Sequence, residues 1–222
     1  MKRKSKWLWG TVCLCSIIAA TIIFSFHEAI LQKTGRFMAP EVNPMADVAD
    51  VVILEGTQFI DRFIVAKGID LLSSGKARRM MIVLHRVSPD DRPFAFYEDY
   101  ASSVRMELQS LGMKESDFTI IETPIRNPIT LTSSKYALQV LVRDRVKSAL
   151  LVSPGFHLRR SYLVYRHLCT PLNITVYPVA CFDDYEPDNW WHEGNGVRDF
   201  VSELAKLMYY LGRGYIPLKL SY

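Results

Sequence analysis

The chain has 222 residues, of which 49% are hydrophobic and 23% are charged, as in an ordinary globular protein. The formal net charge is +4, and Lys2, Arg3, Lys4 and Lys6 supply four positive charges before residue 7. The rest of the chain therefore carries 23 Lys and Arg against 23 Asp and Glu, which balance. A nucleic-acid-binding domain needs a basic face, so this balance argues against nucleic acid as a partner.

The first element in the chain is an apolar segment, WLWGTVCLCSIIAATIIFSF, that runs over residues 7–26 without a charge. A helix of this length spans roughly 30 Å, which is the thickness of the hydrocarbon core of a membrane. The sequence therefore predicts a single-pass transmembrane anchor at 7–27, after a basic cytoplasmic tail at 1–6. By the positive-inside rule the domain lies on the other side, which in a bacterial inner (plasma) membrane is periplasmic or extracellular.

A cleavable signal peptide is the alternative interpretation of this segment. The apolar run is longer than the usual h-region of about 7–15 residues, and no small-x-small cleavage site follows it. These features favour an uncleaved signal anchor. Residues 28–47, with Gly, two Pro and mixed charge from Lys33 onward, predict a stem or linker that leads to a domain at 48–222.

Beyond the stem, short apolar runs alternate with segments of helical periodicity. Strands that are apolar on both faces and separated by helices indicate a parallel sheet covered on both sides. The sequence thus predicts a doubly wound, mainly parallel α/β fold with five strands and helices on both faces. The expected strands are 50–56, 78–85, 118–123, 148–153 and 174–180, and the expected helices are 59–73, 94–111, 130–145, 156–169 and 197–212.

Ligands of such sheets bind at the carboxyl ends of the strands, and several candidate residues stand there. Gly56 after the first strand permits a close backbone approach, Thr130 starts a helix, and Ser153 ends the fourth strand. Cationic side chains next to helix N-termini would suit an anion. The alternative for each arginine is a solvated surface position, and the alternative for His157 is a capping or core position. The cationic candidates are Arg62, Arg86, Arg126, His157, Arg159 and Arg160.

Other chemistries have less support in the sequence. Ser153 lies in VSPGF, which is not the G-x-S-x-G elbow of α/β hydrolases, and no P-loop or dinucleotide-binding motif is present. The acidic segment 181–196 has no recognised metal-ligand spacing, so we predict no metal site, and Trp190 and Trp191 would make it a lid or a membrane contact. Cys169 and Cys181 flank an extended strand and are expected to remain unpaired.

Four segments resemble the YdcF-like family of bacterial envelope proteins, which includes SanA and ElyC. They are VVILEGTQFIDR, NPITLTSSKYA, ALLVSPGFHLRRS and VSELAKLMYYLG, and the resemblance covers roughly residues 48–212. The positions of this chain that match the motif residues of the family are Arg62, Thr130, His157, Arg160 and Glu203. The chain departs from the family where a second glycine usually follows strand one, where Leu84-His85-Arg86 replaces Ser-Gly-Gly, and where Thr132 and Ser133 replace Glu-Asn.

The resemblance implies a role in envelope biogenesis, including peptidoglycan and lipid-carrier metabolism. We therefore expect the domain to bind an anionic, phosphorylated envelope intermediate such as a polyprenyl phosphate or a phospho-sugar. Gly56, Arg62, Thr130, Ser153 and Arg160 are the predicted ligand-binding residues. His157 and Glu203 are the catalytic candidates if the domain is an enzyme, a question that the sequence leaves open together with any cofactor. The alternative is a non-catalytic interaction or scaffold protein of the envelope.

Overall fold

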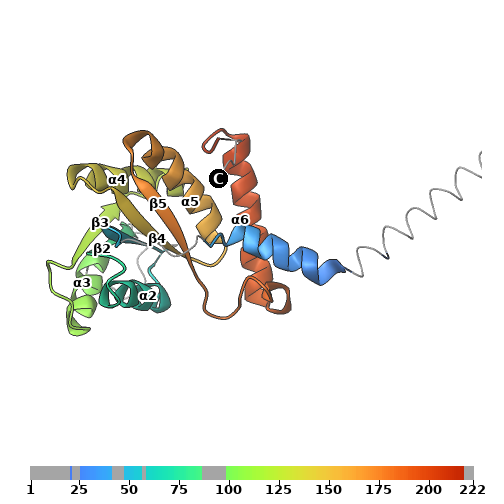
Figure 1. The fold of residues 1–222 in the computed structure, drawn as a ribbon, viewed down its shortest axis with the longest axis horizontal. Coiled ribbons are helices and arrows are strands. Elements are labelled where there is room, and N and C mark those ends of the chain that lie inside the picture. The colour runs from blue at the N-terminus through green and yellow to red at the C-terminus, as the bar shows by residue number, and fades with distance from the viewer. Residues whose placement is uncertain (1–20, 22–25, 42–47, 57–58, 87–98, 218–222) are drawn as a thin grey trace, which may run out of the picture.

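The structure, a computed structural model, describes residue 21 and residues 26–41, 48–56, 59–86 and 99–217. Its centre is a five-stranded sheet in the order β3-β2-β1-β4-β5, and all four strand pairs are parallel (Figure 1). This confirms the predicted α/β fold with a five-stranded parallel sheet. The strands are β1 (Val51–Glu55), β2 (Met80–His85), β3 (Phe118–Thr123), β4 (Ser148–Pro154) and β5 (Thr175–Cys181).

The side chains of a strand alternate between the two faces of the sheet, and here both faces are apolar. Helices therefore cover both faces. In β1, Val51 and Ile53 pack in a core with α4 and α5, whereas Val52 and Leu54 pack in a second core with α2 and α3. Figure 1 shows these two helix pairs on opposite sides of the strands. The helices are α2 (Arg62–Ser73), α3 (Tyr100–Ser110), α4 (Ile129–Arg143), α5 (His157–Cys169) and α6 (Gly194–Gly212).

A third core joins α5, α6 and an N-terminal helix that spans residues 26–38. The sequence predicted a stem or linker at 28–47, and within that range the chain is helical to Met38, which is fully buried. Gly35 allows this packing, since a Cβ there would lie 2.0 Å from the carbonyl oxygen of Pro187. Burial of apolar surface in this third core thus outweighs the helix-weakening effect of that glycine.

Aromatic rings make up much of this third core. The rings of Trp190 and Phe200 stack with centroids 3.9 Å apart, and Phe156 lies edge-on to both. Trp190, in the short helix η3 (Trp190–His192), is therefore a core residue, where the sequence analysis expected a lid or a membrane contact. Cys169 and Cys181 are free, as predicted.

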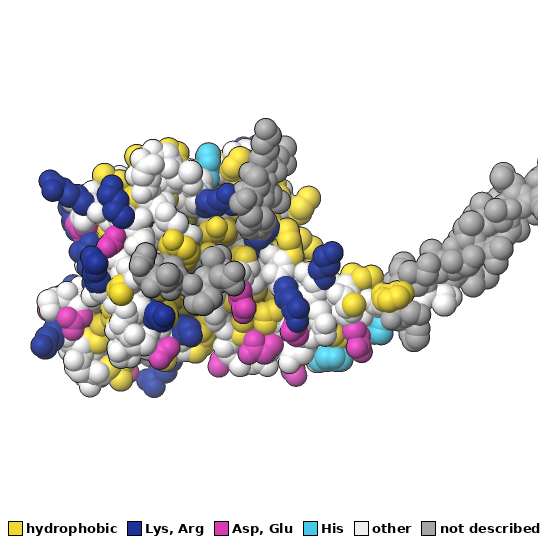
Figure 2. All heavy atoms as spheres, in the orientation of Figure 1, with side chains coloured by type: hydrophobic (Ala, Val, Ile, Leu, Met, Phe, Trp, Pro, Cys, Tyr) yellow, Lys and Arg dark blue, Asp and Glu magenta, His cyan; other side chains and the backbone are white. Residues whose placement is uncertain are grey.

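The predicted transmembrane anchor at 7–27 falls almost entirely outside the described residues. Within the described part of the chain, no helix is both long and apolar enough to cross a membrane. The N-terminal helix projects from the domain and displays hydrophobic side chains along its surface (Figure 2). Phe26, Ile30 and Phe37 are 59%, 47% and 43% exposed.

Candidate functional site

A cavity of about 750 Å³ opens at the carboxyl ends of β1 and β2. Its walls come from the ends of these strands, the loop after β3, the starts of α4 and α5, and the C-terminal half of α6. In the sheet, β2 and β3 lie on one side of β1, whereas β4 and β5 lie on its other side. The direction in which strands are added therefore reverses at β1. Parallel α/β sheets bind ligands at such a switch point.

A buried network around Arg160 forms one wall of the cavity. Arg160 Nε and Nη2 donate to Glu203 Oε2 at 2.9 and 2.8 Å, and Nη1 donates to the Thr130 hydroxyl. Nη2 also lies 2.7 Å from His157 Nδ1. All four residues are at most 9% exposed. The structure therefore brings together four residues that sequence analysis singled out, from three different helices.

Local spacing explains why these groups meet. His157 and Arg160 lie three residues apart in the first turn of α5, and Glu203 and Lys206 have the same spacing on α6. Side chains three residues apart project from the same face of a helix. Contacts between α5 and α6 then place the two pairs opposite each other, with Thr130 reaching them from the first turn of α4.

Glu203 is the anionic centre of this network. Burial alone would raise its pKa, but the cationic groups of Arg160 and Lys206 outweigh burial and hold the pKa well below its usual range. Lys206 Nζ lies 2.8 Å from Glu203 Oε1, and its side chain is 54% exposed at the mouth of the cavity. Glu203 is therefore paired on both oxygens, one with a buried cation and one with an accessible cation.

The contact with Arg160 also fixes the tautomer of His157. A guanidinium group only donates hydrogen bonds, so His157 Nδ1 must accept from Nη2 and the ring proton of this arrangement is on Nε2. Nε2 points toward Glu55 Oε2 at 3.9 Å. His157 thus offers no free lone pair, and this geometry suits an organising role better than the catalytic role considered from the sequence.

Glu55 is a site residue that sequence analysis did not select. It is 3% exposed at the end of β1, where its Oε2 accepts a hydrogen bond from the Ser161 hydroxyl on α5. Strand alternation could have identified it, because Val51, Ile53 and Glu55 share the face that packs against α4 and α5. A carboxylate that ends an otherwise apolar, buried strand is expensive unless it has a function or partners.

His85 is a second site residue that the sequence left unassigned. It ends β2, lines the cavity, and follows Met81 and Val83 on the same face of the sheet. Its Nδ1 lies 3.1 Å from the hydroxyl of Thr123, the residue beside it on β3. Burial lowers the pKa of His85, and Glu55 and His157 act on it in opposite directions. His85 and Glu55 thus form the strand side of the cavity.

Of two further predicted ligand-binding residues, Gly56 lies at the cavity and Ser153 does not. Gly56 lines the cavity, and a Cβ there would lie 2.4 Å from the carbonyl oxygen of Phe59. Ser153 is fully buried in β4 and does not line this cavity, and its hydroxyl has no hydrogen-bond partner among the described residues.

The predicted arginines outside the network lie elsewhere. The Arg62 side chain is 96% exposed and lies 3.7 Å from Glu107, because α2 covers the face of the sheet opposite α4 and α5. Arg86 and Arg126 are exposed and do not line the cavity. Arg159, a cationic candidate for which a solvated surface position was the alternative, is instead 1% exposed and packs on the Phe37 ring, and burial lowers its pKa to about 10.

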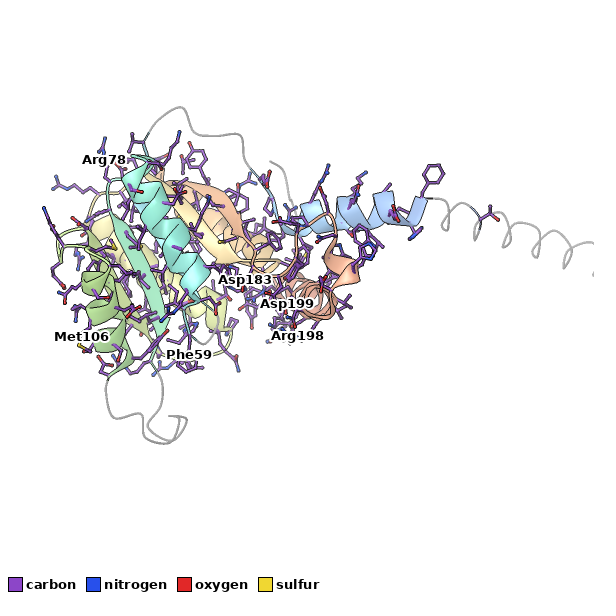
Figure 3. All side chains as sticks on the ribbon, turned by 90° about the horizontal axis from the view of Figure 1, so that it is seen from below. Phe59, Arg78, Met106, Asp183, Arg198 and Asp199 are labelled. Carbon is purple, nitrogen blue, oxygen red and sulfur yellow. The ribbon has the colours of Figure 1, made fainter. Side chains whose placement is uncertain are left out.

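A smaller cavity of about 380 Å³ lies on the other side of His157 and Glu203, which line both cavities. Its entrance is formed by the loop after β5 and the start of α6, where Asp183, Arg198 and Asp199 lie close together in Figure 3. Among the described residues, no group of three or more His, Cys, Asp or Glu side chains is arranged to hold a metal ion.

Comparisons with known proteins do not assign a family. No protein-family profile and no curated protein matches the sequence. A solved structure that matches part of the chain is a bifunctional NMN adenylyltransferase/ADP ribose pyrophosphatase from Francisella tularensis, complexed with AMP and a manganese ion, at a TM-score of 0.41 and 12% identity. The match covers 65% of this chain and only 41% of that enzyme, so no function is transferred from it.

The lowered pKa values of His85 and Glu203 predict a loss of stability in acid. Below pH 6.5 the unfolded chain binds a proton at His85 before the folded chain does, and below pH 4.5 the same holds for Glu203. The free energy of unfolding should therefore decrease as the pH is lowered through each of these two ranges. Urea unfolding at pH 7.5 and at pH 5.5 checks the effect of His85. Between these two pH values the His85→Asn variant should lose less stability than the unmodified protein. Equal losses would contradict a lowered pKa at His85.

Proposed function

We propose that the domain binds an anionic, phosphorylated intermediate of the cell envelope in the 750 Å³ cavity, on the outer side of a membrane to which the N-terminal segment anchors it. The observation that carries the proposal is the meeting of two helix N-termini and an accessible lysine at one cavity in a parallel sheet. A polyprenyl phosphate and a phospho-sugar are the two ligand classes considered.

The starts of α4 and α5 supply hydrogen-bond donors for such an anion. The first turn of a helix has backbone N–H groups without partners in the helix, and the helix dipole adds partial positive charge. Neither helix has a side chain that caps these groups, and Pro128, Ile129 and Thr130 of α4 and His157 of α5 line the cavity. Helix N-termini in this state are common phosphate-binding positions.

Lys206 is the cation best placed to contact the anion. All three nitrogens of the Arg160 side chain already donate to protein groups, namely Glu203, Thr130 and His157. Arg160 is therefore held as a structural partner. Lys206 uses its ammonium group on Glu203 Oε1 but keeps two further N–H donors on a half-exposed side chain. We therefore assign the direct ion pair to Lys206 and the organisation of the site to Arg160.

The rim of the cavity suits the apolar part of an amphiphilic ligand. Ile125, Ile129 and Tyr209 line it and are 46%, 37% and 54% exposed. A hydrocarbon chain that covers these side chains removes apolar surface from water, which is favourable by about 25 cal/mol per Å². A lipid-linked phosphate would thus place its headgroup at the helix N-termini and its chain along the rim.

Titration of the full-length protein in detergent micelles tests the proposal, with inorganic phosphate, farnesyl phosphate and glucose 1-phosphate as probes. We expect at least one phosphate ester to bind and raise the melting temperature. Lys206→Met should weaken that binding by roughly 10- to 100-fold, since a hydrogen bond to a charged group contributes about 1.5–3 kcal/mol. Lys135→Met, an exposed lysine on the outer side of α4, is the matched control. Absence of binding by all three probes would refute the proposal.

The alternative, a non-catalytic interaction protein, is favoured by one observation. Val197, Val201, Leu204 and Met208 follow one another at spacings of four, three and four residues along α6, and all are exposed. An apolar stripe of this kind fits a protein partner. Failure of every phosphate probe to bind would leave this alternative as the better explanation.

A further inference from the structure

The cavity has hydrogen-bond acceptors on one side and donors on the other. Its strand side holds His85, at the end of β2, and Glu55, at the end of β1, whose strands are neighbours in the sheet. Its helix side holds the N-terminus of α4 and the ammonium group of Lys206. A phosphate interacts well with the donors only, so the acceptors need a different part of the ligand.

A hydrogen-bond chain determines which nitrogen of His85 faces a ligand. The Thr123 hydroxyl lies 3.1 Å from the Leu84 carbonyl oxygen and 3.1 Å from His85 Nδ1. A hydroxyl has one hydrogen, and a carbonyl can only accept it. Both contacts are therefore satisfied together only when Thr123 donates to Leu84 and His85 Nδ1–H donates to Thr123.

It follows that Nε2 of His85 carries a lone pair. Among the described residues, no group is hydrogen bonded to Nε2 of His85, and its ring lines the cavity. Burial lowers the pKa of this histidine, which keeps the lone pair unprotonated near neutral pH. His85 therefore presents an acceptor that Thr123 orients from behind.

Glu55 adds a second acceptor beside the first. Its Oε2 already accepts from Ser161, and a carboxylate has room for further donors on its two oxygens. A phosphate group placed against Glu55 would meet like charge, whereas a hydroxyl group placed there would donate to it. The strand side of the cavity thus favours a neutral donor and disfavours the anion.

We infer that the cavity selects a phosphate ester with hydroxyl groups next to the phosphate, which is the chemistry of a sugar phosphate, and that His85 accepts a hydrogen bond from one of these hydroxyls. The inference rests on the proposed function and chooses between its two ligand classes. In the bound state the phosphate lies at the N-terminus of α4 and Lys206, and the sugar hydroxyls lie over His85 and Glu55. His85 is then a specificity-determining residue.

Two phosphate esters that differ in their hydroxyl groups test the inference. Calorimetric titration of the full-length protein in detergent micelles should give a dissociation constant at least tenfold lower for glucose 1-phosphate than for methyl phosphate. His85→Ala should bring this ratio close to one and leave the dissociation constant of methyl phosphate within twofold. His167→Ala, an exposed histidine at the far end of α5, should behave as the unmodified protein does.

A second variant keeps the test decisive if His85→Ala folds poorly. Thr123→Val retains the shape of the side chain but removes the acceptor for Nδ1, so His85 loses its fixed tautomer and the ratio should fall severalfold. A ratio near one in the unmodified protein, or an unchanged ratio in both variants, would overturn the inference while leaving phosphate binding intact. If neither ester binds, the proposed function itself fails, and the two failures are thereby distinguished.

Discussion

Replacing Glu203 with alanine is expected to lower the free energy of unfolding by about 3–5 kcal/mol, because the change leaves a buried guanidinium group without its counter-charge. Arg160 is 5% exposed and makes two hydrogen bonds of 2.8–2.9 Å to one oxygen of Glu203. Thr130 and His157 remain as contacts but carry no compensating negative charge. Equilibrium unfolding in urea measures the effect, provided that the slope of the transition is unchanged.

The matched control for this substitution is Glu107→Ala. Glu107 also pairs with an arginine, Arg62, but at 3.7 Å and with both side chains more than half exposed. Exposed ion pairs contribute little to stability, so the loss should stay within about 0.5 kcal/mol. Equal effects of the two substitutions would mean that the network around Arg160 is no more important to the fold than a surface pair.

Replacing Phe156 with alanine should have an effect of similar size, about 3–5 kcal/mol, through a cavity in the third core. Phe156 is 1% exposed and its ring lies 5.2–5.9 Å from the rings of Phe200, Tyr185 and Trp190. Phe156→Leu keeps most of the apolar volume and should cost less. Urea unfolding of both variants checks the order.

This second prediction bears on the site as well as on stability. Phe156 immediately precedes His157 and is the residue from which α5 begins. Loss of its ring should therefore loosen the start of α5 and weaken phosphate binding along with the fold. A Phe156→Ala variant that unfolds as the unmodified protein does would show that the aromatic core does not fix the start of α5.

Much of the fold could be predicted because its signals are local. The apolar runs located all five strands to within two residues at each end, since strands buried on both faces have few polar positions. The grouping of Thr130, His157 and Arg160 followed from the rule that strand ends and helix starts meet at one edge of a parallel sheet. Glu203 entered through a family resemblance, because nothing local marks it as buried.

The remaining features depend on packing between distant segments. Arg62 and Arg160 both lie in the first turn of a helix after a strand, yet one is 96% exposed at its side chain and the other is buried, because α2 and α5 cover opposite faces. Glu55 and His85 were missed because each ends an apolar strand and only the strand pairing brings them together. Gly35 and Lys33 suggested a linker, but contacts with the segment before α6 keep that region helical.

The most direct test of a phosphate site at the switch point is a crystal structure of the protein with glucose 1-phosphate. The account predicts phosphate density within hydrogen-bond distance of Lys206 Nζ and the first backbone N–H groups of α4, with a sugar hydroxyl on His85 Nε2. Arg160 should keep its contacts with Glu203 and Thr130. Phosphate bound in the smaller cavity near Asp183 and Arg198, or an empty 750 Å³ cavity at saturating ligand, would contradict it.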